Sequence, residues 1–171
     1  ENRIGFNTKM QLSEDSDFTL HYLMHCSRIS ISDTIFYHYS IDNESTMRSN
    51  ADKKVLQYIE AMNITSKYIE KQHENVQLAF NDYILMHLNI ACVRGIFCVN
   101  NKENYVKKIE HTKKIINTPV FKDAIKKFHI KNNFSVRTLP VFFMKYKLVH
   151  IASIIYIVRA YQNYIYEKSR N

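Results

Sequence analysis

The stretch that decides the fold of this chain is VQLAFNDYILMHLNIACVRGIFCV, residues 76–99. It carries a dense load of apolar residues, namely Leu78, Phe80, Tyr83, Ile84, Leu85, Leu88, Ile90, Ala91, Val93, Ile96 and Phe97. Such a load covers more than the single stripe of a surface helix, so this helix is expected to be buried on several sides. We predict that it forms the centre of a helical bundle.

The sequence on both sides of this stretch also has helical spacing. Further helices are expected at 51–73, 102–116 and 119–128, and a last helical region at 139–168. Pro119 suits the first position of its helix, where no backbone N–H is needed. The 171 residues contain only two glycines and two prolines. This shortage of turn residues also predicts a mainly α fold.

A shorter helix is predicted near the start of the chain, from Glu14 to about Cys26. Ser13 precedes it, and its hydroxyl is expected to accept a hydrogen bond from the first turn as an N-cap. Glu14, Asp15 and Asp17 place negative charge at the positive end of the helix dipole. Acidic residues in this place are commonly structural, so the helix start alone does not indicate catalysis.

Two segments after this helix alternate apolar and polar residues, as half-buried strands do. They are residues 28–32 and 35–41, and Asp33 and Thr34 form a plausible turn between them. We predict a short two-stranded β element here. The pattern becomes helical near residue 51, which divides the chain into a first part, 1–50, and a helical domain, 51–171.

Composition limits the classes of function. The net charge of +8 favours anionic partners, but no clustered basic stripe with interleaved aromatic residues indicates nucleic-acid binding. The three cysteines form no CxxC pair, so neither a disulfide framework nor a zinc site is predicted. His21 and His25 are four residues apart but lack a third ligand, so we expect a solvated pair rather than a metal site.

The order of motifs in residues 4–47 carries more information than any single one. Ile4-Gly5-Phe6 is followed by Ser13-Glu14-Asp15, then by Phe18, the two alternating segments with Tyr37-His38-Tyr39, and finally Glu44-Ser45-Thr46-Met47. In order and spacing this resembles the C-terminal part of the catalytic domain of family-two inverting glycosyltransferases, which have the GT-A fold. The resemblance implies that residues 1–50 are the end of a GT-A domain and that a nucleotide-binding half precedes them in a larger bacterial enzyme.

The resemblance also implies roles for individual residues. Asp15 would be the catalytic base, Glu14 would bind the acceptor, and His38 would contact the diphosphate of the donor. The partners would be a nucleotide-sugar and a glycan or lipid-linked acceptor, as in surface polysaccharide synthesis. A divalent metal, Mg or Mn, is expected in the nucleotide-binding half and none in residues 1–171, which should be inactive alone. The expected location is cytoplasmic or peripheral on the inner face of the cell membrane.

The alternative is a non-catalytic helical module that binds a protein or a membrane surface, with Glu14 and Asp15 acting only as helix-start residues. The last helical region contains an apolar run, 148–158, flanked by Lys145, Lys147 and Arg159. Eleven residues are too few to cross a bilayer. This helix either packs on the bundle or lies on an anionic membrane surface.

Overall fold

The computed structural model describes residues 4–37, 51–130 and 135–169. In these ranges the chain forms α-helices, one π-helix and no strand, so the mainly α prediction is confirmed. The elements in chain order are α1 (Glu14–Met24), α2 (Ala51–Ile69), α3 (Glu74–Ile90), η2 (Ala91–Ile96), α4 (Tyr105–Ile116), α5 (Pro119–Lys127), α6 (Leu139–Lys145) and α7 (Val149–Lys168).

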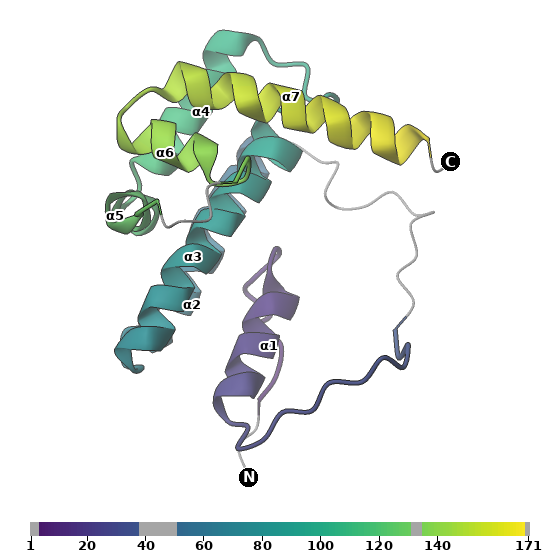
Figure 1. Ribbon diagram of the computed structural model, residues 1–171, viewed down its shortest axis with the longest axis vertical. Helices are drawn as coiled ribbons and strands as arrows, with labels where there is room; N and C mark the ends of the chain where they lie inside the picture. Colours follow the sequence, from purple (N-terminus) through teal and green to yellow (C-terminus); the bar gives the residue numbers. More distant parts are fainter. Residues whose placement is uncertain (1–3, 38–50, 131–134, 170–171) are drawn as a thin grey trace.

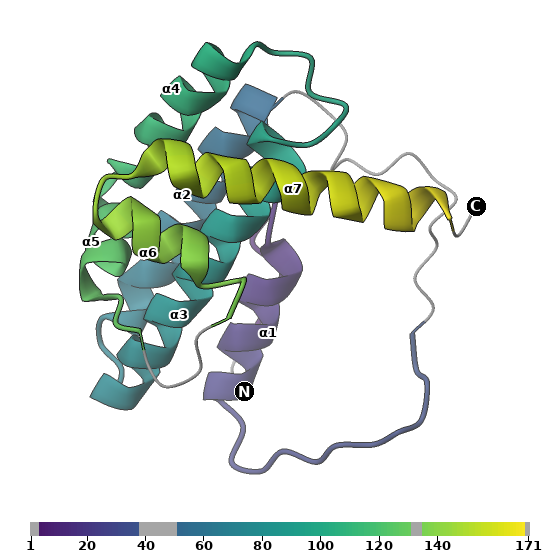
Figure 2. The same ribbon diagram turned by 45° about the horizontal axis from the view of Figure 1, so that its top comes forward.

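Helix α3 and its continuation η2 form the centre of the bundle, as the apolar load predicts. They contact α2, α4, α5 and α7, while α6 packs between α5 and α7 (Figure 1). Helix α1 runs beside α2 and α3 in both views (Figures 1 and 2). Because α3 is covered by several neighbours, its apolar residues face the core in more than one direction.

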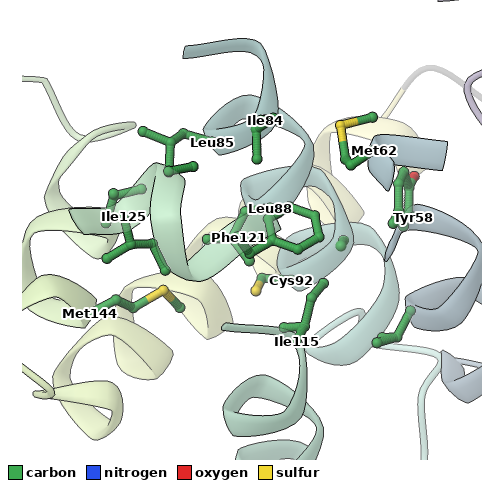
Figure 3. Packing of buried hydrophobic residues seen from close by; sticks show 14 of the residues in the cluster. Tyr58, Met62, Ile84, Leu85, Leu88, Cys92, Ile115, Phe121, Ile125 and Met144 are labelled. Atoms are coloured by element: carbon green, nitrogen blue, oxygen red, sulfur yellow. The ribbon is translucent and has the colours of Figure 1, made fainter. Parts of the chain in front are cut away.

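The core is built around Leu88 of α3. Its side chain is fully buried and lies against Phe121 of α5 in the middle of Figure 3, with Cys92 and Ile115 close by. Burial of one such aliphatic side chain stabilises a fold by about 1.5–3 kcal/mol. This cluster therefore joins α3, η2, α4 and α5 into one unit.

The predicted helices differ from the observed ones mainly at their ends. The helix expected to reach residue 99 becomes a π-helix at Ala91, where Phe97 N–H donates to the Cys92 carbonyl at 2.8 Å. Helix α4 begins later than expected, at Tyr105, because Asn104 accepts a hydrogen bond from Lys107 N–H at 3.0 Å. This is an N-cap, which fixes where a helix starts.

The last helical region is divided in two at Lys147. This residue has a φ of 61°, in the left-handed region, which no residue inside a right-handed helix adopts. Leu148 N–H then donates to the Phe143 carbonyl at 2.9 Å and closes the end of α6. The break allows α6 to pack on α7.

The predicted two-stranded β element is not supported in the part of it that the structure describes. Residues 28–32 and 35–37 have no strand pairing, and Ile29, Ile31 and Phe36 are 67%, 95% and 82% exposed. The remainder of the second predicted strand lies outside the described residues. Alternation alone does not make a strand, because the backbone also needs a hydrogen-bonding neighbour and one face needs a core to cover it.

Helix α7 has one buried face and extends past the bundle at its C-terminal end (Figure 2). Val149, Ala152, Tyr156 and Ala160 are buried against the other helices. None of the helices in the described ranges has the length and apolarity that a bilayer crossing requires.

Candidate functional site

The Glu14-Asp15 pair lies on the first turn of α1. Asp15 is exposed and Glu14 is half-buried. One carboxylate oxygen of Asp15 accepts a hydrogen bond from Ser16 N–H at 2.7 Å, and the Ser16 hydroxyl lies 3.3 Å from the same oxygen. The carboxylate of Asp15 is therefore oriented by its own helix start and remains open to solvent.

The prediction that the Ser13 hydroxyl caps this helix is wrong. Ser13 is the N-cap residue, but its φ and ψ of 63° and 19° are left-handed and its side chain makes no capping hydrogen bond. A capping hydroxyl needs extended backbone angles to reach the N–H groups of the first turn. A non-glycine residue with such a φ is uncommon and costs about 1–3 kcal/mol, and strain of this kind gathers at functional sites.

The third acidic residue of this turn, Asp17, has a different environment. It is only 2% exposed. Its Oδ1 atom accepts hydrogen bonds from the hydroxyls of Thr65, at 2.7 Å, and of Tyr68, both on α2. The ring of His21 lies against that of Tyr68, with centroids 3.9 Å apart. Asp17 therefore holds α1 on α2, since its carboxylate is satisfied only when the two helices are together.

Helix α3 contributes two further polar groups to this interface. The Tyr83 hydroxyl is buried and lacks a hydrogen bond of good geometry, although Ser16 lies beside it. Burial raises the pKa of Tyr83, Ser16 opposes this shift, and the charges of Asp17 and Asp15 add to it. The His87 ring nitrogen Nδ1 lies 3.0 Å from the Tyr83 carbonyl, and burial lowers the pKa of His87.

The pKa of Tyr68 is also raised, first by burial and then by its hydrogen bond to Asp17. A raised tyrosine pKa keeps the hydroxyl protonated, so it continues to donate to the carboxylate. The α1, α2 and α3 interface is consequently a polar cluster with one buried carboxylate, Asp17, and one exposed carboxylate, Asp15.

Phe18 anchors the N-terminal segment to α1. Its ring stacks on that of Phe6, with centroids 4.5 Å apart and an angle of 10° between the planes. Tyr22 continues the stack at 6.2 Å. The three stacked rings hold the N-terminal segment against α1.

The structure brings two of the three predicted site residues, Glu14 and Asp15, together on one turn, while His38 lies outside the described residues. Sequence reasoning placed Asp17 beside them as a helix-dipole charge and missed its burial. A signal was present, because Asp17 precedes Leu20 and Met24 by three and seven residues, and these side chains pack on the core.

His21 of α1 and His25, its C-cap residue, both make other contacts. His25 Nδ1 lies 2.8 Å from the His21 carbonyl, and the His21 ring is occupied by its contact with Tyr68. Among the residues that the structure describes, no group of three or more His, Cys, Asp or Glu side chains is placed to hold a metal ion.

Comparison with known proteins identified no relative of this chain. No protein-family model, no curated protein and no solved structure matches the chain. The functional argument therefore rests on the residues and their geometry.

Proposed function

We propose that this chain is the acceptor-side part of an inverting glycosyltransferase of the family-two, GT-A type, with Asp15 as its catalytic base. The observation that carries the proposal is the contrast between the two aspartates of one helical turn. Asp17 is buried and structural, whereas Asp15 is exposed, oriented by Ser16 N–H and preceded by the strained residue Ser13. Asp15 is also the residue to which the sequence resemblance assigns the base.

The proposed reaction is a single displacement. The acceptor hydroxyl oxygen attacks the anomeric carbon of the sugar, its proton passes to the Asp15 carboxylate, and the bond to the leaving nucleoside diphosphate breaks with inversion. Glu14 points about 100° away around the helix, because one residue of an α-helix turns by that angle, and it is assigned to acceptor binding. His38 keeps its predicted role at the donor's diphosphate.

The segment after α1 gives further support. Ile29, Ile31, Ile35, Phe36 and Tyr37 are all at least two-thirds exposed. Among the described residues, this run of apolar side chains has neither a covering surface nor a paired strand. The central sheet of a GT-A domain would supply both to residues 28–37.

The resemblance implies that the divalent metal of the donor site belongs to the nucleotide-binding half. The residues that the structure describes offer no suitable group of ligands. We keep the metal in the nucleotide-binding half and derive the role of Asp15 without it.

The test is a transfer assay on the natural full-length protein, measuring release of nucleoside diphosphate with and without acceptor. Asp15→Asn should lower the turnover by about 10²–10⁴-fold while donor binding is retained. The matched control is Glu14→Gln, a neighbouring carboxylate on the same turn, which should mainly raise KM for the acceptor. Full turnover in Asp15→Asn would show that the residue is only a helix-start charge.

A second role, binding to an anionic membrane surface, is favoured by the outer face of α7. Ile154, Ile157 and Val158 are exposed there by 59%, 42% and 50%, and the net charge of the chain is +8. An apolar helix face on a basic protein suits the headgroup region of anionic lipid. Double substitution of Ile154 and Ile157 by Asn should abolish sedimentation with phosphatidylglycerol vesicles, and unchanged sedimentation would refute this role.

A further inference from the structure

A groove of about 510 Å³ lies away from the Asp15 turn, on the other side of α3. It is lined by α3 and η2, by residues 128–130 and 137–138, and by the second half of α7. Its apolar wall includes Val93, Phe128 and Ile130. A volume of this size is within the range of small-molecule sites and well above that of a single inorganic ion.

Three arginines from distant parts of the sequence meet at this groove. They are Arg94 of η2, Arg137 before α6, and Arg159 of α7. Asp82 is the one acidic residue among the described residues of the lining, so their formal charge is +2 with histidine neutral. None of these arginines forms an ion pair with an acidic residue in the described ranges. Cations brought together without anionic partners repel one another unless an anion joins them.

Arg159 is the arginine of this groove with an unsatisfied hydrogen-bond donor. Its side chain is half-buried, and its Nη1 atom is buried without a hydrogen-bond partner. An unsatisfied buried donor on a charged group is costly and rare, so it calls for an acceptor.

The polar side chains beside Arg159 in the groove form hydrogen bonds with one another. The Tyr156 hydroxyl donates to Asn89 Oδ1 at 2.8 Å, and Asn89 Nδ2 donates to the Arg137 carbonyl at 3.2 Å. These bonds join α7, α3 and the segment before α6 and so fix the walls of the groove. Among the described residues, no acidic side chain pairs with the guanidinium groups that line these walls.

We propose that this groove binds an organic phosphate, with the phosphate on the three arginines and an apolar body along Val93, Phe128 and Ile130. Guanidinium groups match phosphate oxygens in bidentate geometry, and a charge of +2 matches a phosphate monoester dianion. The apolar wall adds affinity for a ligand that is more than a bare phosphate. This site is separate from Asp15 and does not depend on sugar transfer.

Isothermal titration calorimetry at low salt tests the proposal with four probes. Octyl phosphate represents a lipid-like phosphate, ADP a nucleotide, inorganic pyrophosphate the charge alone, and octyl glucoside the apolar chain alone. The variants are Arg159→Gln and Arg94→Gln, and Arg28→Gln is the matched control because Arg28 is exposed and outside the groove. Circular dichroism checks that each variant is folded. Arg94 is exposed, so its replacement removes no buried side chain.

At least one of octyl phosphate and ADP should bind more tightly than both pyrophosphate and octyl glucoside, and the stronger of the two identifies the source of the phosphate. Each groove variant should weaken that binding about tenfold or more, since hydrogen bonds to a charged group are lost, while Arg28→Gln binds as the original protein does. The proposal is overturned if neither organic phosphate binds better than pyrophosphate. It is equally overturned if Arg94→Gln and Arg159→Gln bind as tightly as Arg28→Gln.

Discussion

Replacing Asp17 by Ala should release α1 from the helical bundle. Asp17 is the only residue of α1 that is fully buried, and its Oδ1 atom accepts both the Thr65 and the Tyr68 hydroxyl hydrogen bonds. Each hydrogen bond to a charged group contributes about 1.5–3 kcal/mol. Loss of both bonds should therefore weaken the docking of α1 by about 3–6 kcal/mol.

Hydrogen–deuterium exchange measured by mass spectrometry is the appropriate assay, because it separates release of α1 from global unfolding. In Asp17→Ala the amides of α1 should exchange at least a hundredfold faster, which corresponds to about 3 kcal/mol. The amides of α3 should keep most of their protection, because the buried side chains labelled in Figure 3 come from α2 to α6 and η2, and α1 adds only the partly buried Leu20 and Met24 to this core.

Two variants control this experiment. Asp17→Asn keeps an oxygen at the position that accepts both hydroxyls, so it should lose only the charge and have a smaller effect. Asp15→Ala removes an exposed carboxylate of the same turn and should change the exchange of α1 only slightly. The reasoning is refuted if Asp17→Ala leaves the protection of α1 unchanged or if Asp15→Ala has the larger effect.

Three further predictions concern stability. Leu88→Ala should lower the free energy of unfolding by about 2–5 kcal/mol in urea titrations, whereas Leu78→Ala, on the same helix but 58% exposed, should change it little; equal losses would contradict the described core. Burial raises the pKa of Cys92 from 9.0 to about 12, so the native protein keeps a proton that the unfolded chain loses above pH 9. The free energy of unfolding should fall between pH 9 and 12 by about 1.4 kcal/mol per pH unit from this group, a slope that Cys92→Ala removes and Cys98→Ala retains. Lys147→Gly should raise the melting temperature slightly, because glycine adopts the left-handed backbone of the α6 and α7 junction without strain; a lower melting temperature would count against it.

The helical core was predictable because its signal is long and repeated. The many apolar residues in 76–99 predict a central position for α3 without any knowledge of the helices around it. Pro119 marks the start of α5. The π-helix was not predictable, since it changes the hydrogen-bond partners of Phe97 without changing the apolar pattern. The division at Lys147 was missed because a lysine gives no sequence signal for a left-handed backbone.

The position of the candidate site could be predicted from the sequence, but the burial of its individual residues could not. The acidic run identified the first turn of α1, and the structure separates it into an exposed Asp15 and a buried Asp17. That separation depends on Thr65 and Tyr68, about fifty residues further along the chain. The arginine groove was equally invisible in the sequence, because its three cations come from three separate elements.

The most direct test of the account compares Asp15→Asn with Asp17→Asn in the natural full-length protein, measuring the rate of sugar transfer and the exchange of α1 amides in both. We predict that Asp15→Asn lowers the transfer rate by at least about a hundredfold with α1 still protected. Asp17→Asn should loosen α1 and lower the rate only in proportion to the undocked fraction. Transfer at the original rate in Asp15→Asn would contradict the assignment of this carboxylate as the base.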